Sequence, residues 1–358
     1  MDIITTPLSD IPERLILGIK SRRVPILLSA PGVGKSSVVR KFADDHDLKL
    51  IDIRLSQMEP TELLGYPHKV DGKTTYIPFD IFPLEGDEVP VKTPAQFDSH
   101  GNKTAEEVRY KGWLLFLDET TNAHPQVLKA AYRLILDREV GFRKLHSHCA
   151  VVAAGNRRKD RALAGDLGTA LQSRMIHYTI ASDLKGWSNW ASSNGVYAPI
   201  VGFVNFAPDL LNNFDPKSIE GSFACERTWE ILSDQLKALP AGFDPDQYLD
   251  VIGGTVGQGA ALRFKEFLHI FSTIPTESDI VSDPLTAPIP TDVGGRMAVA
   301  IYLSEKVNDQ NVDKMMVYLA RLPVEPQVVC VRLIKARQPA LLKTTAFGKI
   351  FTAIAKYI

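Results

Sequence analysis

LLSAPGVGKSS, which runs from Leu27 to Ser37, is the stretch of this chain that decides its fold. An apolar run from Val24 to Leu28 leads into it, a turn with two glycines follows, and a helical pattern begins near Lys35. Small residues in such a turn let backbone N–H groups approach a bound anion closely, and the helix N-terminus favours negative charge there. The segment therefore predicts a phosphate-binding loop.

The loop has the residues that ATP chemistry requires. In the pattern G-x-x-x-x-G-K-[ST], the lysine reaches the β- and γ-phosphates and the hydroxyl residue ligates Mg²⁺. Lys35 and Ser36 stand at those two places, while Ser29 replaces the first glycine. An ordinary glycine-containing turn with a surface lysine would have a similar sequence. Residues elsewhere in the chain must therefore distinguish it from a phosphate-binding loop. The residues expected around the phosphates are Pro31, Gly32, Val33, Gly34, Lys35, Ser36 and Ser37.

A second apolar run ends in two carboxylates. Trp113 to Leu117 is continuously apolar, as in a parallel strand buried on both faces, and Asp118 and Glu119 follow it. Side chains at that end of a strand face the ligand crevice of an open parallel sheet. Asp118 would hold Mg²⁺, and Glu119 would orient and activate the attacking water. The alternative is a strand that leads into an acidic helix N-terminus.

A third apolar run, Ala150 to Ala154, ends in Gly155 and Asn156. The Asn156 amide at a strand end could hydrogen-bond the water or the γ-phosphate. By itself it would indicate only a turn after a strand. Together with the two earlier motifs, it predicts a third residue of one site.

These segments together resemble the AAA+ ATPases, and most closely the MoxR-type family. The resemblance spans residues 10 to about 272, and its motifs are SAPGVGKS (29–36), LLFLDETTNAHPQVLKAAYRLILDREV (114–140), VVAAGN (151–156), LQSRM (171–175) and CERTWEIL (225–232). It implies that Lys35 and Ser36 form Walker A, that Asp118 and Glu119 form Walker B, and that Asn156 is sensor 1. It further implies ATP and Mg²⁺ as cofactors, Arg174 as the arginine finger and Arg227 as sensor 2.

The role of Arg174 has alternatives. An arginine from a neighbouring subunit can stabilise the charge that develops on the γ-phosphate, which would make the active site inter-subunit. Arg174 could instead be a solvated cation at a helix end. Arg157, Arg158 and Arg161 are rival finger candidates, although a run such as RRKDR is usually a solvated loop.

The order of the elements predicts an α/β fold, namely a P-loop NTPase core with a parallel sheet, a C-terminal helical lid and a further helical tail. The predicted domains are 1–181 (nucleotide-binding core), 182–272 (lid), 273–294 (proline-rich linker or arm) and 295–358 (helical tail). We expect strands near 24–28, 50–55, 113–117, 150–154 and 176–180, and helices near 10–22, 35–46, 59–64, 124–137 and 167–173. Residues 65–111 are polar and rich in proline, so we expect no compact-core element there.

Composition sets further bounds. The chain has 358 residues, a net charge of -1, no apolar run long enough to span a bilayer and no secretory leader, which predicts a cytoplasmic protein. Its three cysteines, Cys149, Cys225 and Cys330, are scattered and indicate no disulfide framework.

In the run HSHC, His146 and His148 fall on one face of an expected strand and Cys149 on the other, which argues against a metal site. The apolar end FGKIFTAIAKYI fits a docked helix or a membrane-surface helix.

The resemblance also implies how the protein works. It implies a homo-oligomeric, hexameric ring that remodels a protein substrate, often through a partner with a von Willebrand A domain. In such a ring, Gly65-Tyr66-Pro67 and Gly141-Phe142-Arg143 are candidates for pore contacts, or are simply turns with a packed aromatic. The alternative functions are a motor or loader that acts on DNA, and a nucleotide-gated switch, which would not need Glu119.

Overall fold

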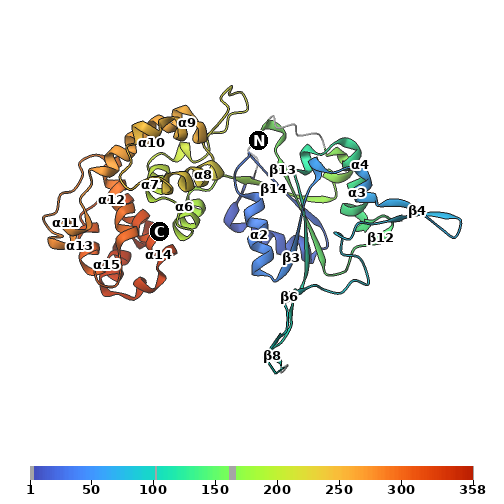
Figure 1. Ribbon diagram of the computed structural model, residues 1–358. Helices are drawn as coiled ribbons and strands as arrows, with labels where there is room; N and C mark the ends of the chain where they lie inside the picture. The colour runs from blue at the N-terminus through green and yellow to red at the C-terminus, as the bar shows by residue number, and fades with distance from the viewer. Residues whose placement is uncertain (1–3, 101–102, 161–166, 358) are drawn as a thin grey trace. The chain divides into compact units, whose positions relative to one another are not determined.

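The computed structural model describes residues 4–100, 103–160 and 167–357. Contacts divide the chain into two units, Met1–Ala181 and Ser182–Ile358 (Figure 1). The buried apolar residues fall into clusters that each lie within one of the two units. Each unit therefore has a core of its own.

Six strands of the described part of the first unit form one sheet, and all of its neighbouring strands are parallel. The order across the sheet is β1-β14-β2-β13-β10-β3. The bounds are β1 (Thr6–Pro7), β2 (Val24–Ser29), β3 (Leu48–Arg54), β10 (Gly112–Asp118), β13 (Cys149–Asn156) and β14 (Met175–Ala181). The predicted parallel-sheet core is confirmed. β1 was not predicted, because two residues carry no periodicity.

Helices cover both faces of this sheet. They are α1 (Ile11–Lys20), α2 (Lys35–Asp45), α3 (Pro60–Leu64), α4 (Pro125–Tyr132) and α5 (Gly168–Gln172). Side chains of β10 alternate between the two faces. Leu115 and Leu117 join the core that α3 and α4 cover, whereas Leu114 and Phe116 are buried on the other face, towards α1 and α2. The helix predicted over 124–137 ends its α-helical part at Tyr132 and continues as a π-helical turn, Arg133–Asp137.

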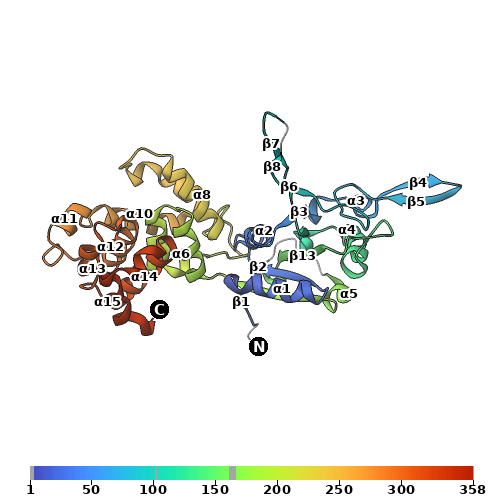
Figure 2. The ribbon, with the colours of Figure 1, turned by 90° about the horizontal axis from the view of Figure 1, so that it is seen from below.

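The first unit also has two-stranded ribbons, and those of residues 66–77 and 91–109 project from it (Figures 1 and 2). The ribbons pair β4 (Tyr66–Val70) with β5 (Lys73–Ile77), β6 (Val91–Thr93) with β9 (Val108–Arg109), β7 (Gln96–Phe97) with β8 (Lys103–Ala105), and β11 (Glu139–Val140) with β12 (Arg143–Lys144). Between the ribbons, however, Phe82 and Leu84 are buried in the core of the unit. The expectation that residues 65–111 contribute nothing to a compact core is therefore wrong at these two positions.

The histidine run also differs from its prediction. β13 begins at Cys149, so His146 and His148 lie in the turn before the strand, with ring centroids 5.2 Å apart. No group of three or more His, Cys, Asp or Glu side chains that could hold a metal ion occurs among the residues with described structure.

The second unit is helical where it is described. Its helices are α6 (Leu184–Ser193), α7 (Ala198–Phe206), α8 (Glu226–Lys237), α9 (Leu249–Val256), α10 (Gln258–Ser272), α11 (Glu277–Ser282), α12 (Val293–Lys306), α13 (Val312–Leu319), α14 (Val324–Arg337) and α15 (Thr345–Ile354). Phe347, Ile350 and Ile354 of α15 are buried in its core, which supports a docked helix rather than a membrane-surface one. Within the described ranges, no helix is both long and apolar enough to cross a bilayer.

Candidate nucleotide site

The loop between β2 and α2 has the backbone conformation that an anion-binding turn requires. Gly32 (φ 80°) and Gly34 (φ 92°) adopt left-handed conformations that residues with a Cβ rarely take. Gly34 is followed directly by α2, which begins at Lys35. The loop therefore presents the N-terminus of an eleven-residue helix, where unpaired N–H groups favour a phosphate.

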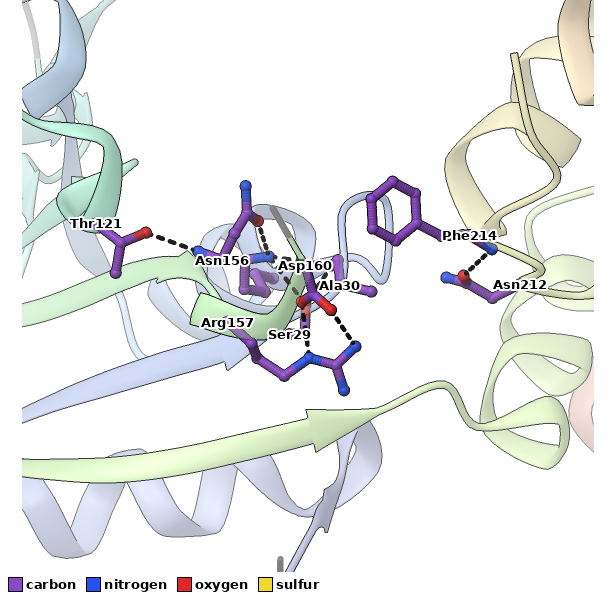
Figure 3. Close-up of polar contacts among 9 residues, drawn as sticks. Ser29, Ala30, Thr121, Asn156, Arg157, Asp160, Asn212 and Phe214 are labelled. Atoms are coloured by element: carbon purple, nitrogen blue, oxygen red, sulfur yellow. Dashed lines mark hydrogen bonds and ion pairs between the residues drawn. The ribbon is translucent and has the colours of Figure 1, made fainter. Parts of the chain in front are cut away.

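Lys35 brings the ends of two strands together. Its Nζ donates to Ser29 Oγ at the end of β2 (2.9 Å) and to Asn156 Oδ1 at the end of β13 (3.3 Å). It also lies 3.4 Å from the Ala30 carbonyl oxygen. Ser29 and Asn156 are direct partners in the pairing of β2 with β13, so strand register sets their proximity (Figure 3).

Ser36 and Asp118 form the second part of the site. Ser36 Oγ donates to Asp118 Oδ2 (2.8 Å), and the other Asp118 oxygen accepts the Glu119 backbone N–H (2.8 Å). A hydroxyl and a carboxylate are hard oxygen donors of the kind that Mg²⁺ prefers. Since Mg²⁺ usually takes one or two protein oxygens and completes its shell with water and phosphate, these two residues fit it.

A third carboxylate, Asp52, lies on the neighbouring strand β3. Burial raises the pKa of Asp52, and repulsion from Asp118 raises it further. Arg40 of α2 partly offsets this, with its guanidinium nitrogen 3.4 Å from Asp52 Oδ2. Negative charge is thus concentrated beside Asp118, which is where a bound cation would be stabilised.

Glu119 is held from two sides. Its backbone is left-handed (φ 54°), which is uncommon for a residue with a side chain. Its Oε2 accepts a short hydrogen bond from the Ser56 hydroxyl, which follows the end of β3. Sequence reasoning missed Ser56; the only available signal was a polar residue just beyond a predicted strand, next to the strand that ends in Asp118.

Asn156 is positioned by Thr121. The Asn156 backbone N–H donates to Thr121 Oγ1 (2.9 Å), and Thr121 is buried in the turn after Glu119 (Figure 3). Gly155 permits this approach, because a Cβ built there would lie 2.6 Å from Thr121 Oγ1. Thr121 was also missed, since one threonine in a turn has no sequence signature.

The candidate arginines have different surroundings. Arg157 makes a bidentate ion pair with the buried Asp160 (2.8 and 3.0 Å), so its guanidinium is bound to a carboxylate of the same loop (Figure 3). Arg174 is exposed, and its guanidinium donates to the carbonyl oxygen of Ala170 within α5 (3.0 Å). Arg158 is exposed, whereas Arg161 lies outside the described residues. Arg227 is exposed in the first turn of α8, in the second unit, so its assignment as sensor 2 stays a prediction.

Comparisons with known proteins identify the domain. Residues 25–175 match the family model described as an AAA domain of the dynein-related subfamily. No curated protein sequence matches the chain. Solved structures that match the chain include a RuvB variant from Thermotoga maritima (14% identity, covering 97% of this chain and 95% of that one, TM-score 0.39). Others are a protein described as an ATPase from Cytophaga hutchinsonii (15%, 99% and 91%, 0.36) and NtrX from Brucella abortus in complex with ATP (12%, 100% and 66%, 0.38).

Proposed function

We propose that this chain, whose residues 25–175 match the model of an AAA domain, is an ATP-hydrolysing enzyme of the MoxR type and uses ATP to remodel another macromolecule. One observation carries the assignment of the site. Side chains from β2, α2, β10 and β13 converge through the contacts Lys35–Ser29, Lys35–Asn156 and Ser36–Asp118. These contacts join all three motifs of the sequence at one edge of the sheet.

The proposed chemistry follows from these contacts. Lys35 and the loop N–H groups would hold the β- and γ-phosphates, and Ser36 with Asp118 would hold Mg²⁺, which would neutralise phosphate charge. Glu119 accepts a proton from a water molecule while the oxygen of that water attacks the γ-phosphorus. The bond from that phosphorus to the bridging oxygen breaks, and ADP leaves with the electron pair. Asn156 donates from its amide to the attacking water or the γ-phosphate.

We extend the proposal to a homo-oligomer in which Arg174 acts on the nucleotide of a neighbouring subunit. Two features support this role: Arg174 is exposed, and a phosphoryl transfer site gains from an added cation. A hexameric ring, a protein substrate and a von Willebrand A domain partner follow from the resemblance to MoxR-type proteins. A cytoplasmic location stays a prediction from the sequence.

The first test is the ATPase rate per subunit against protein concentration. We expect the wild-type rate to rise with concentration, and the rate of Arg174→Ala to stay low at every concentration. Arg158→Ala tests the rival arginine, and Arg23→Ala is a matched control at another exposed position. A rate that is independent of concentration and unaffected by Arg174→Ala would contradict the inter-subunit site.

Two further arms complete the experiment. Glu119→Gln should bind ATP as wild type does and fail to hydrolyse it; normal turnover would remove Glu119 as the base. DNA should leave the rate unchanged, since the net charge of -1 gives no general attraction to phosphate backbones. Stimulation that falls steeply with added salt would instead identify a motor or loader that acts on DNA.

A further inference from the structure

We propose that Ser29 is a positioning residue for Lys35, and that its hydroxyl fixes the ammonium group for nucleotide binding. The inference rests on the proposed phosphate role of Lys35. Phosphate loops of the G-x-x-x-x-G-K-[ST] pattern have glycine at this position, which offers no side chain. In this chain the departure from the pattern supplies an additional hydrogen-bond acceptor.

The position of Ser29 suits this role. It is the last residue of β2, its exposure is 0%, and it pairs in register with Asn156 of β13. Its backbone carbonyl oxygen also accepts from the Arg157 N–H (3.3 Å), so the main chain around it is held by the neighbouring strand (Figure 3). A side chain anchored in this way has little freedom to move when ATP arrives.

The hydrogen bonds of Ser29 can be assigned without ambiguity. A serine hydroxyl has one proton to donate and two lone pairs, whereas a lysine ammonium can only donate. Ser29 Oγ lies 2.6 Å from the Ala30 carbonyl oxygen, which can only accept, so the serine proton is directed there. Its lone pairs then face Lys35 Nζ at 2.9 Å.

This arrangement localises the end of a flexible side chain. The lysine side chain has four carbons and loses much rotamer freedom when its ammonium is localised. Ser29 Oγ and Asn156 Oδ1 accept from Nζ, from adjacent strands, and the Ala30 carbonyl oxygen lies 3.4 Å from it. Because this ordering precedes nucleotide binding, its loss should weaken ATP affinity and leave the rate of the saturated enzyme almost unchanged.

The test compares ATP affinity and steady-state kinetics of Ser29 variants of the full chain. In Ser29→Ala we expect the KM and the Kd for ATP to rise about ten- to 150-fold, the loss of one hydrogen bond to a charged group, with kcat within about twofold. Ser29→Cys keeps nearly the same volume but offers a weak acceptor, so it should behave as Ser29→Ala does. Ser29→Thr keeps the hydroxyl and should restore wild-type affinity. Ser29→Gly tests the same loss without any packing strain.

A double-mutant cycle with Lys35→Met separates positioning from structure. If Ser29 acts through Lys35, then Ser29→Ala should have no further effect on ATP affinity once Lys35 is replaced. An equal effect in both backgrounds, or wild-type affinity in folded Ser29→Ala and Ser29→Gly, would overturn the inference and leave the ATPase site intact. Wild-type affinity in Lys35→Met would overturn both the phosphate role of Lys35 and the inference that rests on it.

Discussion

At the scale of single residues, the proposed base is held in an unusual conformation. Glu119 has φ 54°, and a left-handed non-glycine residue costs about 1 to 3 kcal/mol unless its surroundings fix it. Here those surroundings include Asp118, which accepts the Glu119 N–H, and Ser56, which donates to its carboxylate. The carboxylate is therefore oriented before it meets a water molecule.

Replacing Ser56 should lower the rate of the chemical step. In Ser56→Ala the Glu119 carboxylate loses its orienting donor, and we expect kcat to fall about three- to tenfold, within the contribution that a positioned base makes. KM for ATP should change little, since the Ser56 hydroxyl acts on the carboxylate of the proposed base and not on a phosphate. Ser56→Thr keeps the hydroxyl and is the matched control. A wild-type kcat in Ser56→Ala, measured at saturating ATP, would show that the bond does not orient the base.

Thr121 gives a second prediction at this scale. Thr121→Val has nearly the same shape but removes the acceptor of the Asn156 N–H, which should cost about 1 to 3 kcal/mol if no water replaces it. Hydrogen exchange of peptides that cover residues 150–158 should then be faster, and kcat should fall because Asn156 is less well placed. Thr121→Ser keeps the acceptor and should exchange almost as wild type. Unchanged exchange in Thr121→Val would mean that the threonine hydroxyl does not hold the strand end.

At the scale of elements, the parallel sheet and the clustering of the main candidate site residues at its carboxyl end could be predicted because they follow repeating patterns. The apolar run at Trp113 to Leu117 requires burial on both faces, and parallel strands bring their carboxyl ends to one edge. This is why Asp118 and Asn156 could be assigned to the same site. Ser56 and Thr121 could not, because each acts through a single hydrogen bond between segments that are distant in sequence. The ribbons between residues 66 and 109 were missed because their strands are short and largely exposed.

The ribbon that contains β6 and β9 is fastened to the sheet by one carboxylate. Asp47, in the turn between α2 and β3, accepts from Lys92 Nζ (2.5 Å) and Lys111 Nζ (2.9 Å), which lie in and next to the two strands at its base. Asp47→Asn should loosen this base, so we expect faster hydrogen exchange at residues 91–97 and 103–110. Asn is the appropriate replacement because it tolerates the left-handed conformation of Asp47 (φ 55°). Unchanged exchange would mean that backbone pairing alone holds the ribbon.

The same contact predicts how the ribbon responds to pH. Hydrogen bonds from Lys92 and Lys111 lower the pKa of Asp47 from 3.8 to about 2. A carboxyl with a lowered pKa contributes stability above its unfolded value and loses it as the pH falls through the folded one. The contribution should therefore be constant from neutral pH down to about 5, and should decline only in strong acid. The hydrogen exchange of residues 91–97, corrected for the intrinsic rate, should therefore be the same between pH 5 and 8. Faster corrected exchange towards pH 5 would show that the contribution of Asp47 is lost earlier than expected.

At the scale of the whole molecule, the two units have separate apolar cores, and this should appear in how the chain unfolds. Trp229 is the largest fully buried side chain; it packs against Phe203 and Phe264 with ring centroids 5.5 Å away in each case, and its indole N–H donates to Leu210. All of these residues lie in Ser182–Ile358. A cavity at Trp229 should consequently weaken the helical unit without opening the core that contains the nucleotide site.

We expect Trp229→Ala to destabilise the second unit by about 3 to 5 kcal/mol, the usual cost of removing a large buried aromatic. Calorimetry of the full chain should then show one unfolding transition moved to lower temperature and another in place, with the unmoved one still raised by ATP. Ile231, on the same helix and 45% exposed, is the matched control, and Ile231→Ala should change stability by no more than about 0.5 kcal/mol. A single transition that moves to lower temperature in Trp229→Ala would mean that the two cores unfold together. In that case, nucleotide bound to the first unit would raise the unfolding temperature of both units equally.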